Sequence, residues 1–163
     1  MSTDHTSTDP TTAADIIERL GLQPLPMEGG QWAVSWRNEH VSAIHFLLQP
    51  GDFSALHALA ATELWHHHDG APVQMVLLGP GGSVERPVLG SDLAAGHRPM
   101  VGVEPGVWMG ASTLGEWSLL STSVTPPYED HHFTLGGRDQ LLASHPDAAA
   151  DIEALTRPIG EEP

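Results

Sequence analysis

The residues best suited to chemistry in this chain gather in residues 51–70, which read GDFSALHALAATELWHHHDG. This stretch holds one histidine, His57, then Glu63 six residues later, and then a run of three histidines. Imidazole and carboxylate groups bind metal ions, transfer protons and orient polar ligands. We therefore expect a chemical centre of this protein to lie here, with His57 and Glu63 as its polar focus.

The alternation of side chains along a strand sorts these groups into two faces. If a strand begins at Glu63, the side chains of Glu63, Trp65 and His67 share one face, and the intervening residues share the other. Glu63 and His67 are then about 7 Å apart. A carboxylate, an indole and an imidazole on one wall are typical of a ligand pocket, so we expect Trp65 and His67 to line it.

Composition excludes several partners and several kinds of chemistry. The 163-residue chain has 21 acidic residues, six basic residues and a formal net charge of -15, so its field repels nucleic acid and anionic lipid. Cysteine and lysine are absent, which excludes a thiol nucleophile, a thiolate metal site and a lysine Schiff base. No apolar run approaches the roughly 20 residues that cross a bilayer. We expect a cytoplasmic protein whose partner is a small molecule, without nucleic-acid or membrane partners.

The elements that position these groups are predicted to be short strands. The chain has 17 glycines and 14 prolines without a fixed repeat, and they separate short apolar or alternating runs. We expect strands at 31–36, 42–48, 53–57, 63–68, 73–78, 84–88, 100–103, 107–111 and 117–124. Asp69-Gly70 is expected to begin the turn after the histidines. This spacing favours a compact antiparallel barrel or jelly roll.

Helices are expected only at the two ends of the chain. Thr12 is predicted to cap a short helix that Gly21 ends, and helical spacing returns at 138–144 and 148–155. The length suits one domain. We place it at residues 12–157, between a disordered tail at 1–11 and a flexible tail at 158–163.

The spacing around His57 resembles the first motif of the cupin superfamily. That motif is Gly, five residues, His-x-His, three or four residues, Glu, six residues, Gly, and residues 51–70 follow it with Leu59 in place of the second histidine. The segments SAIHFLLQPGDFSALH, ELWHHHDG, GSDLAAGHRP, PGVWMGA and HHFTLGGRDQLL are similar to the cupin-5 group (domain of unknown function 985). The resemblance covers roughly residues 16–155. It implies a mainly β double-stranded β-helix, or jelly-roll cupin barrel, with short terminal helices, one pocket and assembly as a homodimer.

The resemblance also bears on a metal. In metal-using cupins three histidines and one glutamate bind the ion, whereas this chain has Leu59 and Met109 at two of those positions. Catalytic zinc and non-haem iron sites usually need three protein ligands. A divalent Zn, Fe, Mn or Ni ion would therefore need substitutes, and the candidate ligands are His57, Glu63, His67 and His45.

Further pocket residues follow from the same resemblance. Trp108 and Met109 fall in the match to the second cupin motif and are expected to line the pocket with His45. Tyr128, the only tyrosine, is a candidate proton donor at the barrel mouth by analogy with cupin epimerases that use His and Tyr. A surface or packing role is the alternative for Tyr128.

We expect a small-molecule-binding cupin that works by proton transfer next to a carbonyl, with His57 as base and Glu63 orienting it or the substrate. An isomerase, epimerase or cyclase step on a carbohydrate-like or secondary-metabolite substrate fits this chemistry. One alternative is a metal-dependent oxygenase or hydrolase. The other is a non-catalytic module that binds a metabolite.

Overall fold

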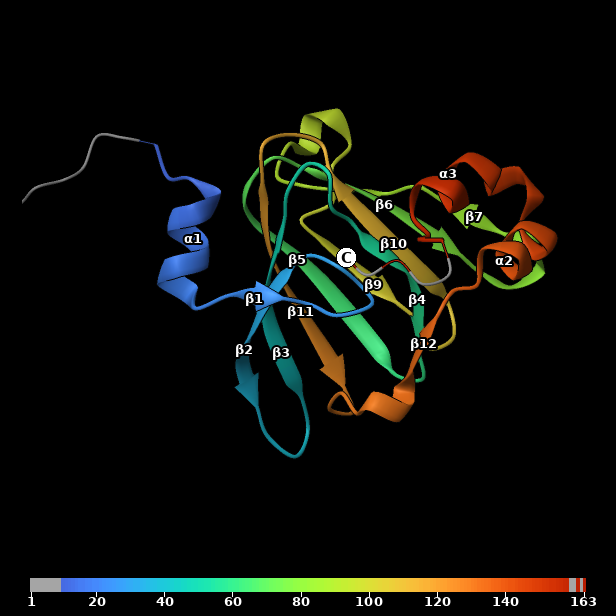
Figure 1. The fold of residues 1–163 in the computed structure, drawn as a ribbon, viewed down its shortest axis with the longest axis horizontal. Helices are drawn as coiled ribbons and strands as arrows, with labels where there is room; N and C mark the ends of the chain where they lie inside the picture. Colours follow the sequence, from blue (N-terminus) through green and yellow to red (C-terminus); the bar gives the residue numbers. More distant parts are fainter. Residues whose placement is uncertain (1–9, 159–160, 162) are drawn as a thin grey trace, which may run out of the picture.

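Two antiparallel sheets build the protein in a computed structural model that describes residues 10–158, 161 and 163 (Figure 1). The first sheet has the strand order β1 (Gln23–Pro24), β2 (Gln31–Arg37), β3 (Ser42–Leu48), β11 (Ser118–Thr125), β5 (Thr62–Gly70) and β9 (Met100–Val103). The second has the order β12 (Phe133–Leu135), β4 (Ser54–Leu59), β10 (Trp108–Thr113), β6 (Val73–Leu78) and β7 (Val84–Glu85), and β8 (Val88–Leu89) also pairs with β6. Strands distant in sequence are therefore neighbours in space, as in a jelly roll.

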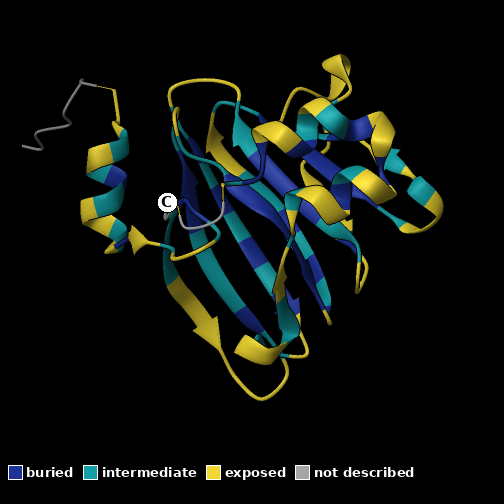
Figure 2. Ribbon diagram, turned by 45° about the vertical axis from the view of Figure 1, so that its right-hand side comes forward, coloured by how far each residue is buried: buried dark blue, intermediate teal, exposed yellow. Residues whose placement is uncertain are grey.

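The main core lies between the sheets, because alternate residues of the central strands are apolar. Phe46, Trp65 and Leu120 come from three adjacent strands of the first sheet and are almost fully buried. Met75 and Met109 meet them from the second sheet in the same cluster. Figure 2 shows the central strands as the most buried part of the molecule.

Helix α1 (Ala13–Leu20) begins at Thr12 because that residue forms a complete capping box with Asp15. The helix ends at Gly21, whose φ of 62° suits glycine. Its Ile16 packs with Leu47 on the outer face of the first sheet. The expected bounds of this helix are confirmed.

Helices α2 (Arg138–Ser144) and α3 (Ala149–Ala154) lie beside the second sheet (Figure 1). Their Leu141 and Ile152 pack against Leu56 and Val76 of that sheet. Four short 3-10 turns complete the described part of the chain: η1 (Pro80–Gly82), η2 (Leu93–Ala95), η3 (Asp130–His132) and η4 (Pro146–Ala148).

The mainly β jelly roll with short terminal helices is confirmed, but three local expectations are wrong. Strand β5 continues through Gly70, because a bulge opposite Leu119 and Leu120 carries the pairing past the histidines. The run 84–88 divides into β7 and β8. Strands β1 and β12 do not correspond to any apolar run in the sequence, and they were not expected.

The expected domain of 12–157 stays a prediction. Most of the tail predicted at 1–11 and three residues of the tail at 158–163 lie outside the described residues. Among the residues that the structure describes, no helix is both long and apolar enough to cross a membrane.

Candidate functional site

A cavity of about 360 Å³ brings His57 and Glu63 together, and we refer to it as the His57 cavity. Strands of both sheets and the 25–30 loop line it. Its apolar walls include Trp32, Val34, Ile44, Leu59, Val124 and Phe133. Its polar lining comprises Glu28, Arg37, Ser42, His57, Glu63, Thr122, Tyr128 and Asp130. The lining is thus largely apolar, and two of its charged groups, Glu28 and Glu63, lie near His57.

His57, on β4, is held in one orientation. Its Nδ1 lies 2.7 Å from the backbone oxygen of Ala55, which can only accept a hydrogen bond, so Nδ1 carries the proton. Its ring stacks on Phe133 of β12, with centroids 5.3 Å apart and planes at 20°. Because a neutral imidazole has one N–H, the Nε2 atom is left as the basic nitrogen.

Two carboxylates flank that nitrogen. Glu28 Oε1 is 3.8 Å and Glu63 Oε2 is 4.0 Å from His57 Nε2. Glu63 Oε2 is buried and has no hydrogen-bond partner among the described residues. Burial, with a smaller contribution from the negative charge of Glu28, raises the pKa of Glu63 to about 7, against the opposing effect of His57. Glu63 can therefore hold or release a proton near neutral pH.

Glu28 is a site residue that sequence reasoning missed. It belongs to the 25–30 loop between β1 and β2, and its Oε1 accepts a hydrogen bond of 2.7 Å from the hydroxyl of Ser54. Ser54 itself is fully buried. An acidic residue next to Gly29-Gly30 follows no strand or helix period, so nothing in the pattern distinguished it from the surface acids.

Tyr128 also lines the cavity. Its backbone N–H donates to the hydroxyl of Ser42, and its backbone oxygen accepts from Arg37. Burial raises the pKa of its phenol, which keeps the hydroxyl protonated. Asp130, two residues later, lines the same cavity.

The other residues predicted to line the pocket lie outside the His57 cavity. Trp65 does share the inward face with Glu63, but it is fully buried in the main core, edge-to-face with Phe46. Met109 is buried in that core, and Trp108 packs with the cluster beneath α2 and α3. Neighbouring side chains therefore cover Trp65 and Met109, and they cover Trp108 in part.

The two predicted histidines have other surroundings. His67 Nε2 lies 3.0 Å from the backbone oxygen of Ala71, which holds the ring at the end of β5. His45 is opposite Ser121 of β11 and alternates with the inward Phe46, so it lies on the outer face of the first sheet. Neither reaches the cavity lining.

The residues around His57 do not fit a transition-metal centre. Bonds of 2.0–2.2 Å place neighbouring ligand atoms about 3.0–3.6 Å apart, whereas the carboxylate oxygens are 3.8 and 4.0 Å from Nε2. No group of three His, Asp or Glu side chains within the described residues is arranged to hold a metal ion. We therefore assign no metal ligands.

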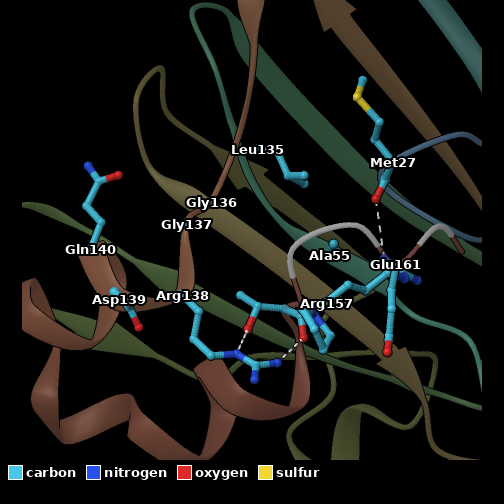
Figure 3. Close-up of a pocket in the computed structure, with 12 residues that line it drawn as sticks. Met27, Ala55, Leu135, Gly136, Gly137, Arg138, Asp139, Gln140, Arg157 and Glu161 are labelled. Carbon is cyan, nitrogen blue, oxygen red and sulfur yellow. Dashed lines mark hydrogen bonds between the residues drawn. The ribbon is translucent and has the colours of Figure 1, made fainter.

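A larger cavity of about 570 Å³ shares Met27 with the first, and we refer to it as the Arg157 cavity (Figure 3). Gly136, Arg138 and Arg157 contribute to its lining. Both guanidinium groups are hydrogen bonded to protein oxygens, Arg138 to Thr156 and Arg157 to Met27 and others. The 25–30 loop thus contributes to both cavities.

The jelly-roll topology and a cavity lined by both sheets define a protein of the double-stranded β-helix class. The chain belongs to the cupin superfamily, because the family described as Cupin superfamily (DUF985) matches residues 14–136. This confirms the resemblance that the motif around His57 indicated. A search among curated proteins finds no match.

Solved structures agree with this assignment. The crystal structure of a Shewanella oneidensis protein is 34% identical, with a TM-score of 0.86, and the match covers 91% of this chain and 99% of that one. A hypothetical protein from Leishmania major is 25% identical, with a TM-score of 0.84 and coverage of 91% and 100%. KdgF from Halomonas sp. is 15% identical, with a TM-score of 0.54 and coverage of 68% and 91%, so it shares the fold alone.

Proposed function

We propose that this cupin binds a small molecule in the His57 cavity and transfers protons next to a carbonyl group of that molecule. The observation that carries the proposal is the basic Nε2 of His57, which is directed by the Nδ1 contact to Ala55 and lies 4.0 Å from a buried carboxyl group. A base and an acid in one cavity are the two groups that an isomerase, epimerase or cyclase step needs.

In the proposed reaction His57 Nε2 removes the proton from the carbon next to the carbonyl. Glu63 in its acid form gives its proton to the carbonyl oxygen, and an enediol or enol results. Return of a proton from the His57 imidazolium to the former carbonyl carbon of an enediol, with transfer of the proton of the neighbouring hydroxyl to Glu63, completes the isomerisation. Protons and electrons balance, and no oxidant or reductant is required.

The cavity lining favours an uncharged substrate with a substantial apolar part. Aromatic and aliphatic side chains form most of the walls, and the acidic lining residues Glu28, Glu63 and Asp130 outnumber the single guanidinium of Arg37, which disfavours an anion. Among the carbohydrate-like and secondary-metabolite substrates that this chemistry accepts, we therefore propose a neutral hydroxycarbonyl compound over a sugar acid.

Deuterium exchange tests the proposal without knowledge of the product. The protein in D₂O is incubated with neutral hydroxyketones, aldoses and lactones and with anionic sugar acids, and NMR follows the C–H next to each carbonyl. We expect exchange in at least one neutral compound, and a loss of about 10²-fold or more in His57→Ala. The matched control is His45→Ala on the outer face, which should exchange at the wild-type rate.

Two results would favour the alternatives. Ligand-induced thermal stabilisation without any exchange would support a non-catalytic binding module. A stoichiometric transition metal in protein purified without an affinity tag, lost in the His57→Ala, Glu63→Ala double variant, would support a metal-dependent cupin. Exchange that persists in His57→Ala would remove His57 as the base.

A further inference from the structure

The 25–30 loop, which carries Glu28, has an unusual backbone conformation. Met27 has a φ of 64°, and Gly29 and Gly30 have φ values of 96° and 80°. A non-glycine residue with positive φ costs free energy and persists where the surrounding structure imposes it. Contacts from outside the loop must therefore hold it in this conformation.

Arg157, in the segment after α3, supplies these contacts. Its Nη1 donates to the backbone oxygens of Glu28, at 2.9 Å, and Met27, at 3.3 Å, and Figure 3 shows the latter contact. Its Nη2 donates to Asp52 Oδ1 at 2.9 Å, and its guanidinium lies 4.0 Å from the centroid of the Phe53 ring. The side chain is 13% exposed, so water competes little for these bonds.

Asp52 links the same arginine to the far end of the loop. Its second oxygen, Oδ2, accepts a hydrogen bond of 2.7 Å from the backbone N–H of Gly30. Arg157 therefore holds the loop directly at residues 27 and 28 and, through Asp52, at residue 30. The loop cannot shift without breaking several charge-assisted hydrogen bonds.

The held loop fixes the Glu28 side chain. The Glu28 backbone oxygen also accepts from the N–H of Ala55 at 2.8 Å, and its Oε1 accepts from the Ser54 hydroxyl. Both partners lie on β4, the strand that carries His57. These contacts place the carboxylate 3.8 Å from His57 Nε2, on a different element from Glu63.

We propose that Glu28 is a third functional group of this site, a carboxylate that stabilises the imidazolium form of His57, and that Arg157 is a positioning residue that sets Glu28 through the loop. This role rests on the proposed function, because it concerns the proton that His57 accepts. The charged or titratable groups that line the cavity around His57 are Glu28, Glu63, Asp130, Tyr128 and Arg37. Of these, Glu28 and Glu63 lie within 4.0 Å of Nε2.

The pKa of Glu63 depends on how close the Glu28 charge lies, so a titration of Glu63 tests the position of Glu28. This experiment needs no substrate. A nearby negative charge disfavours ionisation of Glu63, so Glu28→Gln should lower the pKa of Glu63. Arg157 contacts the backbone of Glu28 but neither carboxyl group, yet Arg157→Gln should lower the same pKa because the Glu28 side chain is released. Arg157→Lys should restore part of the shift. Carbon-13 NMR of labelled carboxyl groups follows the titration.

Arg86→Gln is the control, because Arg86 pairs with Asp151 at 2.8 Å on a half-exposed surface and should leave the Glu63 titration unchanged. An unchanged titration in Glu28→Gln would overturn the role of Glu28. A lowered pKa in Glu28→Gln with a wild-type titration in Arg157→Gln would overturn the positioning role alone. If Arg157→Gln does not fold, Arg157→Lys decides: a wild-type titration there overturns positioning, and an intermediate one supports it.

The deuterium-exchange experiments test the proposed reaction, and the titration tests the positions of Glu28 and Arg157, so either can give a negative result without the other. If no compound exchanges deuterium but the titration behaves as expected, the proposed reaction is wrong and the three-group arrangement stands. When a substrate is known, Glu28→Gln should lower kcat by about tenfold or more with little change in KM, because it acts on the charged imidazolium.

Discussion

Glu63 has a carboxyl group whose pKa the fold raises to about 7. It is buried, and one of its oxygens has no hydrogen-bond partner within the described part of the chain. Its proton is therefore retained to a higher pH than in a solvated glutamate. This property is useful to a proton-transfer site, and it makes the stability of the fold depend on pH.

Glu63→Gln should remove that dependence. The folded pKa of about 7 exceeds the ordinary value of 4.5, so the folded state binds more protons in that window and stability falls as pH rises through it. The loss is at most about 3 kcal/mol, from 1.36 kcal/mol per unit. We expect urea unfolding to give similar stabilities for both proteins near pH 4.5 and a more stable Gln variant at pH 8.

The exposed Glu104 provides the matched control. Glu104→Gln should follow the wild-type curve at both pH values, because it removes the same charge from a solvated position. Parallel pH curves for the wild type and Glu63→Gln would contradict a raised pKa at Glu63.

Sequence reasoning placed some residues of the site because their order along a strand has a simple period. Alternation predicts that Glu63 and Trp65 share a face, and both indeed point inward. Alternation cannot tell which inward residue meets a cavity and which meets the core, and that depends on the opposite sheet. Glu28 was unpredictable because long-range contacts from Ser54 and Arg157 position it.

At the scale of elements, two glycines with positive φ show different constraints. Gly21 ends α1 in open space, with no atom within 4 Å of the position that a Cβ would take. A Cβ on Gly29 would clash with the backbone oxygen of Phe53 and would lie 2.5 Å from Nη2 of Arg157. Glycine is therefore needed at position 29 for two reasons: the backbone has a positive φ, and a side chain would clash with Arg157.

Alanine substitutions separate these two constraints. Gly21→Ala should cost about 1 kcal/mol of unfolding free energy, from the left-handed conformation alone. Gly29→Ala should cost roughly 3 kcal/mol or more, because the added methyl group displaces Arg157 or the loop. Chemical unfolding measures both variants, and equal costs would show that Arg157 is not packed against Gly29.

Elements with local signals were predictable, and elements made by tertiary pairing were not. Thr12 and Gly21 define α1 because caps act within a few residues. Strand β12 has no such signal. It forms because residues 133–135 pair with β4, and this pairing brings Phe133 onto the His57 ring.

At the scale of the whole molecule, one sheet face lacks the charge that dominates the rest of the chain. Beyond α1, the outer face of the first sheet presents two cross-strand rows without a charged residue: Trp36, Ala43, Ser123, Leu64 and Gly102, and Ala33, His45, Ser121, His66 and Met100. Trp36 is 61% and Met100 is 51% exposed. The second half of β2, residues 34–37, is exposed and is drawn in yellow in Figure 2.

The homodimer expected from the resemblance stays a prediction, and this face is where we expect it to form. Two chains of formal charge -15 repel, and the repulsion is least where uncharged surfaces meet. Native mass spectrometry and light scattering should find a dimer for the wild type and a monomer for Trp36→Glu. Leu93→Glu, at a 68% exposed position on η2, is the control that should remain dimeric. A monomeric wild type would contradict the prediction.

The distribution of the five tryptophans has a practical consequence. Trp32 lines the His57 cavity, whereas Trp65 lies in the main core, Trp108 beneath the C-terminal helices, Trp117 near α1 and Trp36 on the outer sheet face. Of the five, Trp32 is therefore the one indole among the residues that line the His57 cavity. A ligand bound in the His57 cavity should change the intrinsic fluorescence of Trp32, and Trp32→Phe should abolish that change. Tryptophan fluorescence can therefore be used to screen for ligands of this protein.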